Sequence, residues 1–107
     1  MPFVRPLPKN NFYAVIFASS KSDTLDGYAE MDEEVMRLAQ EQPGYLGYES
    51  AGDNSRGIFI SYWENKEAIE AWRIHAVHKM AKAQAHKWYK RYLSQICIVE
   101  SSHLFEI

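Results

Sequence analysis

Short aromatic and β-branched runs alternate with stretches of helical spacing along this 107-residue chain. Residues 11–19 carry the run FYAVIFA, which is too short for a free helix and predicts a strand. After the polar segment 20–25, a helix is predicted over residues 26–42, with Asp26 as N-cap and Pro43-Gly44 as its end. Its apolar residues follow the spacing of one buried stripe: Tyr28, Met31, Val35, Leu38 and Ala39.

The second half of the chain predicts a hairpin, a helix and a last strand. Residues 45–51 and 57–63 read as strands, and the sequence GDNS at 52–55 is turn chemistry that joins them. Strong helix formers without internal glycine or proline predict a helix from Glu64 to about Lys87. A fourth strand is predicted over residues 93–99.

The resulting order, βαββαβ, predicts an α+β fold of the ferredoxin-like type: a four-stranded antiparallel sheet with both helices on one face. The length fits one domain, which we assign to residues 11–107. Within it, residues 101–107 either extend the last strand or form a short tail strand. Residues 1–10 are predicted to be an extended arm because Pro2, Pro6 and Pro8 prevent a helix.

Both faces of the predicted sheet are apolar, although a face in water should be polar. Within the first strand Val15 and Phe17 point one way, and Ala14 and Ile16 point the other. Such a face would be a sticky patch in a monomer, so we expect a two-fold homodimer. A ligand cavity on that face is the competing explanation, and both can hold together.

The net charge of -2 indicates neither a nucleic-acid partner nor attraction to an anionic membrane. No apolar stretch approaches the roughly 18 residues needed to span a bilayer, and no signal peptide is visible. The single cysteine, Cys97, fits a reducing compartment, so the expected location is the cytoplasm.

Three histidines, His75, His78 and His86, fall on one arc of the second predicted helix. A His-x-x-His pair can share a metal ion, but Lys79 and Lys82 occupy the same arc and would repel a cation. We therefore expect no metal, and a solvated face explains the arc.

An aromatic cluster surrounds the same helix and its exit: Trp63, Trp72, Trp88, Tyr89 and Tyr92. Core packing is the usual role of such residues. Alternatively, some of them line a substrate-binding pocket between helices and sheet for a flat molecule. Trp72 is the best pocket candidate, because it lies at the edge of the apolar stripe of the second helix. That stripe consists of Ile69, Val77, Met80, Gln84 and Trp88.

Three sequence segments resemble the antibiotic biosynthesis monooxygenase-like domains. They are WENKEAIEAW at 63–72 followed by HAVH at 75–78, PGYLGYES at 43–50, and the pattern WYxxY at 88–92. The resemblance extends from Phe12 to Phe105 and implies a dimeric α+β barrel in which two sheets pack face to face.

Members of that family include cofactor-independent oxygenases that act on polycyclic phenols, and haem-degrading enzymes. Trp72 matches a tryptophan of the haem-degrading group. The position of its haem-ligating histidine falls on Lys82, however, and the first strand has no asparagine within residues 12–18. Haem binding or degradation is therefore the least favoured function.

The resemblance favours a monooxygenase without metal, flavin or other cofactor, acting on an aromatic or quinone-like molecule in a pocket between helices and sheet. Trp72 would form a wall, and His75 or His78 would serve as base or anion partner, because histidine titrates near neutral pH. The alternative is a non-catalytic small-molecule-binding or stress-response homodimer that uses the same pocket.

Overall fold

The computed structural model describes residues 8, 11–82 and 85–107, excluding the side chains of residues 77, 78, 80–82 and 85. The predicted 1–10 arm lies almost entirely outside these residues. The elements are β1 (Phe12–Lys21), α1 (Tyr28–Gln40), β2 (Tyr45–Gly52), β3 (Arg56–Trp63), α2 (Lys66–Lys82), a 3-10 turn η1 (Ala85–Lys87) and β4 (Tyr89–Val99). Their order confirms the predicted βαββαβ arrangement.

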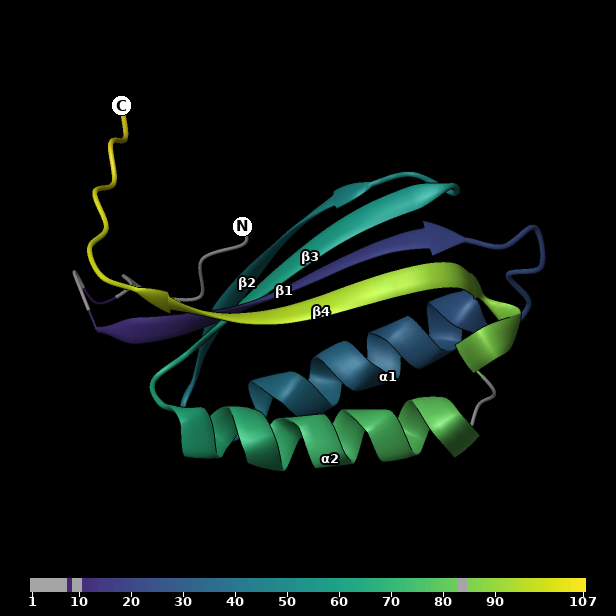
Figure 1. Cartoon of the computed structure of the whole chain (residues 1–107), viewed down its shortest axis with the longest axis horizontal. Helices are drawn as coiled ribbons and strands as arrows, with labels where there is room; N and C mark the ends of the chain where they lie inside the picture. The colour runs from purple at the N-terminus through teal and green to yellow at the C-terminus, as the bar shows by residue number, and fades with distance from the viewer. Residues whose placement is uncertain (1–7, 9–10, 83–84) are drawn as a thin grey trace.

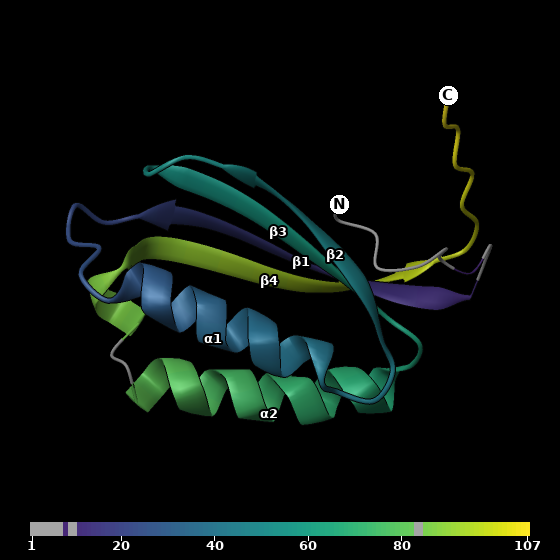
Figure 2. The same cartoon turned by 180° about the vertical axis from the view of Figure 1, so that it is seen from behind.

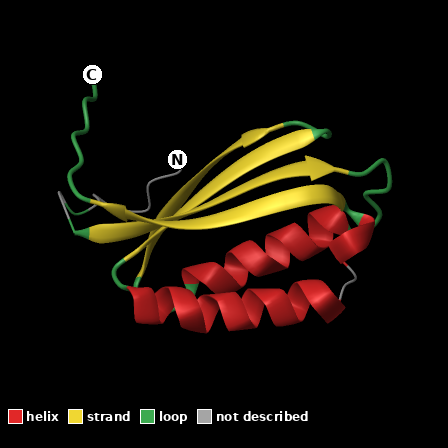
Figure 3. Cartoon of the chain, viewed as in Figure 1, coloured by secondary structure: helices red, strands yellow, loops and turns green. Residues whose placement is uncertain are grey.

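The four strands form one antiparallel sheet in the order β2-β3-β1-β4. Both helices lie on the same face of this sheet, as Figures 1 and 2 show from opposite sides. The structure therefore has two layers, one of strands and one of helices (Figure 3). The opposite face, which we call the open face, carries no helix.

The helices are packed tightly against the sheet at one end, which we call the packed end. Four buried residues from four different elements form the core there: Ala39 of α1, Tyr45 of β2, Trp63 of β3 and Ile69 of α2. Trp63 and Ile69 have no exposed surface at all. This end lies where α1 finishes and α2 begins, because Pro43 and Gly44 return the chain directly into β2.

Burial decreases along both helices away from the packed end. On α1, Ala39 is buried while Tyr28, at the far end, is only partly buried. On α2, Ile69 is buried, Trp72 is partly buried and His75 is exposed. The helix layer therefore covers the sheet closely at one end and incompletely at the other.

The start of α1 differs from the prediction. Gly27, not Asp26, is the N-cap, and it adopts a left-handed conformation with φ of 81° and no side-chain cap. The carbonyl of Asp26 instead accepts a hydrogen bond from the indole Nε1 of Trp88 at 2.8 Å. This long-range contact fixes the chain just before α1 and explains why the helix begins later than expected.

The end of α2 and the start of β4 also differ. The helix ends at Lys82 rather than near Lys87, and β4 begins at Tyr89 rather than Leu93. The backbone N–H of Ser22 donates to the carbonyl of Trp88 at 2.7 Å, so the segment after η1 is drawn to the end of β1. Tertiary pairing has overridden the local helix propensity of this segment.

Residues 100–107 form neither an extension of β4 nor a strand of their own. They leave the sheet on the side away from the helices, which both Figures 1 and 2 show. No described helix combines the length and apolar character needed to cross a membrane.

Gly44 is predicted to be indispensable to the packed end. Its φ is +85°, and an added Cβ would lie 2.7 Å from the Cβ of Ala68, which is too close for either atom. Gly44→Ala should lower the free energy of unfolding by about 2–4 kcal/mol, since strain in a left-handed backbone and overpacking add. Urea denaturation measures the change.

Gly27→Ala is the matched control. Gly27 has a similar φ of +81°, but its added Cβ would meet Trp88 at an ordinary 3.5 Å. It should cost about 1 kcal/mol, from the backbone conformation alone. Equal losses in the two variants would contradict the close packing of Gly44 on α2.

Candidate functional site

Aromatic side chains cross the whole sheet on the face that meets the helices. Each strand contributes one of them, and we call the set the aromatic band: Tyr48 of β2, Phe59 of β3, Phe17 of β1 and Tyr92 of β4. The rings form two stacked pairs. Tyr48 and Phe59 lie 5.4 Å apart at 19°, and Phe17 and Tyr92 lie 5.1 Å apart at 22°.

The strand register places these residues on one face. Phe17 is directly opposite Phe59, and Ser19, two residues along the same face of β1, is opposite Tyr92. Val15, two residues in the other direction, packs against the core cluster of the packed end. The band therefore belongs to the helix-facing side of the sheet.

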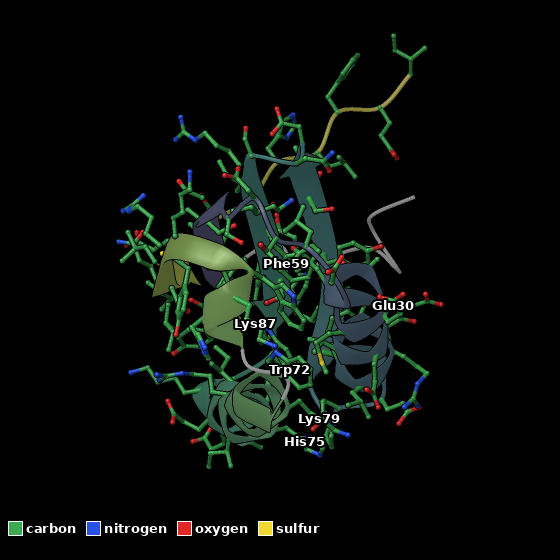
Figure 4. All side chains as sticks on the ribbon, turned by 90° about the vertical axis from the view of Figure 1, so that its right-hand side faces the viewer. Glu30, Phe59, Trp72, His75, Lys79 and Lys87 are labelled. Atoms are coloured by element: carbon green, nitrogen blue, oxygen red, sulfur yellow. The ribbon has the colours of Figure 1, made fainter. Side chains whose placement is uncertain are left out.

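The helices leave this band incompletely covered. Phe17, Phe59 and Tyr48 are only partly buried, and Tyr92 is 57% exposed. Figure 4 looks along the helices and shows Phe59 between the sheet and the helix layer, with Trp72 below it and Glu30 on the outer side of α1. A flat apolar molecule could stack on such a surface, because aromatic walls are typical of small-molecule sites.

Two tyrosines form a polar end to the band. Tyr28 begins α1 and Tyr89 begins β4, and their rings meet edge to face at 5.9 Å. Tyr89 also contacts Phe17 of the band at 5.6 Å. Burial, then interaction with the Tyr28 hydroxyl, raises the pKa of Tyr89 well above its usual range. Its phenol therefore stays protonated at neutral pH and remains a hydrogen-bond donor.

Asp32 lies one helical turn after Tyr28 and is close enough to act electrostatically on both tyrosines. Asp32 is exposed as a whole residue, but desolvation of its carboxyl raises the pKa of that group, and the positive charge of Lys21 opposes the rise. Lys21 itself is held over the Tyr28 ring, with Nζ 5.3 Å from its centroid. A carboxylate with a raised pKa beside an aromatic surface is a candidate proton acceptor.

Trp72 is stacked between two other rings. One is Trp63, 6.1 Å away at 25°, and the other is His75, 6.4 Å away at 25°. The series runs from the buried core outwards, since Trp63 is buried and His75 is exposed. Lys79, one turn after His75, donates to Glu34 of α1 at 3.4 Å, so this side of α2 faces α1. The side chain of His78 is outside the described residues.

The predicted binding residues occupy two kinds of place. Trp63 and Trp88 are buried, and each indole N–H has a partner: Trp63 donates to the Ser61 hydroxyl at 2.9 Å and Trp88 to the Asp26 carbonyl. These two have the environment of packing residues. Tyr89 and Tyr92, in contrast, belong to the polar end and to the aromatic band.

Five residues of this site were not predicted as site residues from the sequence: Phe17, Tyr28, Phe59, Tyr48 and Asp32. Phe17 and Phe59 follow the strand alternation, but only the β1–β3 register places them opposite each other. Asp32 lies among other carboxylates, including Glu33 and Glu34, and nothing in the sequence distinguishes it from solubilising charge. Among the described residues no group of three or more metal-ligating side chains is placed to hold an ion.

Residues 11–84 match the sequence profile of the antibiotic biosynthesis monooxygenase family, which is more than half of the chain. The chain belongs to this family. Its order of elements, two-layer arrangement and one-sided helices are those that the sequence resemblance implied.

One curated relative and two solved structures are similar to this monooxygenase-family chain over almost their whole lengths. The uncharacterised protein YqjZ of Bacillus subtilis is 41% identical over 108 residues, covering 99% of this chain and 95% of its own. SnoaB, a cofactor-independent oxygenase from Streptomyces nogalater, superposes with a TM-score of 0.70 at 7% identity, covering 86% and 96% of the two chains. Protein SO0527 of Shewanella oneidensis gives a TM-score of 0.72 at 7% identity, covering 87% and 95%.

Neutralising Asp32 should stabilise the fold at neutral pH. Because burial raises the pKa of this carboxyl in the folded state, its ionised form costs stability above that pKa, and the cost disappears as pH falls below the unfolded pKa. We expect Asp32→Asn to melt at a higher temperature than the parent at pH 7, with the difference vanishing near pH 3. Thermal melts across this pH range measure it.

Glu30→Gln is the matched control for this experiment, since Glu30 is an exposed carboxylate on the outer side of the same helix (Figure 4). It should change the melting temperature little at any pH. If Asp32→Asn is destabilising at pH 7, favourable contacts stabilise the carboxylate, and its interpretation as a desolvated proton acceptor with a raised pKa fails.

Proposed function

We propose that this chain binds a flat aromatic molecule of the phenol or quinol type on the aromatic band and oxidises it with O₂ without metal or flavin. The observation that carries the proposal is the band itself: it faces the helix layer, yet it is not enclosed by it. Membership of the family and the SnoaB-like fold support the same reaction class.

The polar end supplies the groups that such a reaction needs. A phenol must lose its proton before it can give electrons readily to O₂, and the Asp32 carboxylate is the proposed acceptor. The phenols of Tyr28 and Tyr89 would donate hydrogen bonds to the resulting substrate oxyanion, because they remain protonated at neutral pH. The band holds the ring system flat against the sheet.

Trp72, His75 and His78 remain the competing assignments. In that version Trp72 forms the wall, and one of the histidines takes the proton. Trp72 adjoins the core through Trp63, and His75 lies at the outer end of the same stack. The two versions place the base on different helices, so mutation separates them.

Oxygen uptake with a panel of quinols and polycyclic phenols tests the proposal. Asp32→Asn should lower kcat by roughly 100-fold or more, as expected for loss of a general base. Phe59→Ala should mainly raise KM, because it removes stacking surface from the band. Glu30→Gln should leave both values unchanged.

Other outcomes assign the site differently. If His75→Ala or His78→Ala abolishes turnover while Asp32→Asn does not, the base lies on α2. If the panel raises the melting temperature without oxygen uptake, the chain is a binding module rather than an oxygenase. If neither occurs with any compound, the proposed substrate class is wrong.

We also propose that two chains pair through the open faces of their sheets. Ile58 and Leu93 lie on that face, opposite Ala18 of β1 on either side, and remain 52% and 45% exposed. A second copy is the natural cover, since an identical apolar face is self-complementary about a two-fold axis.

Leu93→Glu should convert the dimer to a monomer, because it would bury a charge between two apolar sheets. Light scattering after size-exclusion chromatography gives the mass. Ile74→Glu is the control: Ile74 is 73% exposed but lies on α2, in the other layer, so its variant should stay dimeric. A monomeric parent protein, or equal effects of the two variants, would contradict the pairing.

A further inference from the structure

The segment after β4 exposes large apolar side chains. Leu104 is 59% exposed and Phe105 is 76% exposed, and neither lies in a helix or strand. The segment leaves the sheet on the side of the open face (Figures 1 and 2). Exposed apolar residues on a projecting segment are typical of a surface that is covered in an assembly.

The open face has a matching depression at the opposite end of β4. Its volume is about 280 Å³, and it is formed by β1, β2, β3 and the start of β4. Ile58 and Ala18 line it, and Leu93, which is opposite Ala18 on β4, continues the same apolar row outside the lining residues. Two residues further along each strand lies a basic row, Arg56–Ser20–Arg91.

The two arginines of the basic row have no acidic partner within the part of the chain that the structure describes. The ion pairs formed by arginines there involve Arg37 and Arg73, both on helices. The projecting segment carries Glu106 directly after Phe105. Its charge and its apolar residues therefore complement the depression.

The spacing agrees as well. In an extended segment Leu104 and Glu106 point to the same side, roughly 7 Å apart. The apolar and basic rows of the depression are also two residues apart along their strands, which is the same separation. One segment can thus place Leu104 on the apolar row and Glu106 on the basic row at the same time.

A chain cannot reach its own depression with this segment. β4 runs from Tyr89 to Val99, so the segment leaves from the end farthest from Arg91. If it turned back at once over its own sheet, Glu106 would come opposite about residue 95, roughly 13 Å short of Arg91. The occupant must therefore come from another molecule.

We propose that Leu104 and Glu106 of one chain bind the depression of a second copy, with Leu104 against Ile58 and Leu93 and Glu106 between Arg56 and Arg91. The inference rests on the proposed pairing of the open faces and completes it. The sheet alone presents roughly 500 Å² per chain, below the roughly 800 Å² per partner of a typical stable interface. Two such segments per dimer supply the missing area.

A disulfide between two different chains tests the location of Leu104. In a Cys97→Ser background, Leu104→Cys chains are co-expressed with differently tagged Ile58→Cys chains and oxidised mildly. The expected result is a covalent heterodimer on a non-reducing gel, because a seated residue 104 comes within disulfide range. Leu104→Cys with Ile74→Cys is the control pair and should not cross-link, since Ile74 lies in the helix layer.

A charge exchange tests the location of Glu106. Arg91→Glu should raise the dissociation constant of the dimer roughly two- to fivefold, as for loss of an exposed ion pair. Combining it with Glu106→Arg should restore the parent value. A cross-link without this charge effect would overturn the assignment of Glu106.

The outcomes separate this inference from the pairing on which it rests. Suppose that the protein is dimeric, that Leu93→Glu dissociates it, and that the cross-link does not form. The segment then lies elsewhere, so the inference is overturned while the pairing stands. If the parent protein is monomeric, both fall. A chain that carries both Leu104→Cys and Ile58→Cys gives one more outcome. If this chain forms the disulfide within itself while the separately substituted chains do not cross-link, the segment lies on its own sheet and the exchange is overturned.

Discussion

One buried indole, Trp63, joins the two layers of this protein. Its ring contacts Tyr45 edge to face at 5.5 Å and stacks on Trp72 at 6.1 Å, while its N–H is satisfied by Ser61. Trp63 ends β3 and leads directly into α2, so the same residue belongs to the sheet and fixes where the second helix starts. Burial of a side chain this large is worth about 3–5 kcal/mol, a substantial fraction of the stability of a small domain.

The core cluster lies at one end, and Trp88 is buried at the other end beside Tyr28, so the helix layer covers the sheet less closely between them. The aromatic band lies beyond the core on the same sheet face and is bounded by the tyrosines at the start of α1 and β4. Rings that would be enclosed in a fully packed domain remain available to a ligand. The same division explains why the two tryptophans with buried indoles, Trp63 and Trp88, differ in surroundings from the exposed Tyr92.

The sequence was sufficient for the order of elements because periodicity is a local property. Helical spacing gave α1, and the sequence GDNS gave the hairpin, where the Asp53 carboxylate accepts hydrogen bonds from the N–H groups of Ser55 and Arg56. The predicted boundary between α2 and β4 was wrong because it depends on a tertiary contact, the hydrogen bond from the Ser22 N–H to the Trp88 carbonyl at the end of β1. Predicting the aromatic band requires the strand register, and distinguishing Asp32 from the other carboxylates requires its proximity to two tyrosines. Local sequence patterns contain neither kind of information.

The one-ended packing also bears on how such a domain can diverge. Phe17, Phe59 and Tyr92 of the aromatic band lie outside the core cluster, whereas Tyr48 packs against it. Substitutions at positions that do not contact each other have nearly additive effects on stability. Substitutions at those three positions can therefore accumulate without a matching loss of fold, provided that the packed end is kept. SnoaB has the same fold at 7% identity, with a TM-score of 0.70, so the fold tolerates extensive sequence change. The packed end therefore carries the stricter packing constraint, and the part of the sheet surface that does not contact it tolerates substitution at a smaller cost in stability.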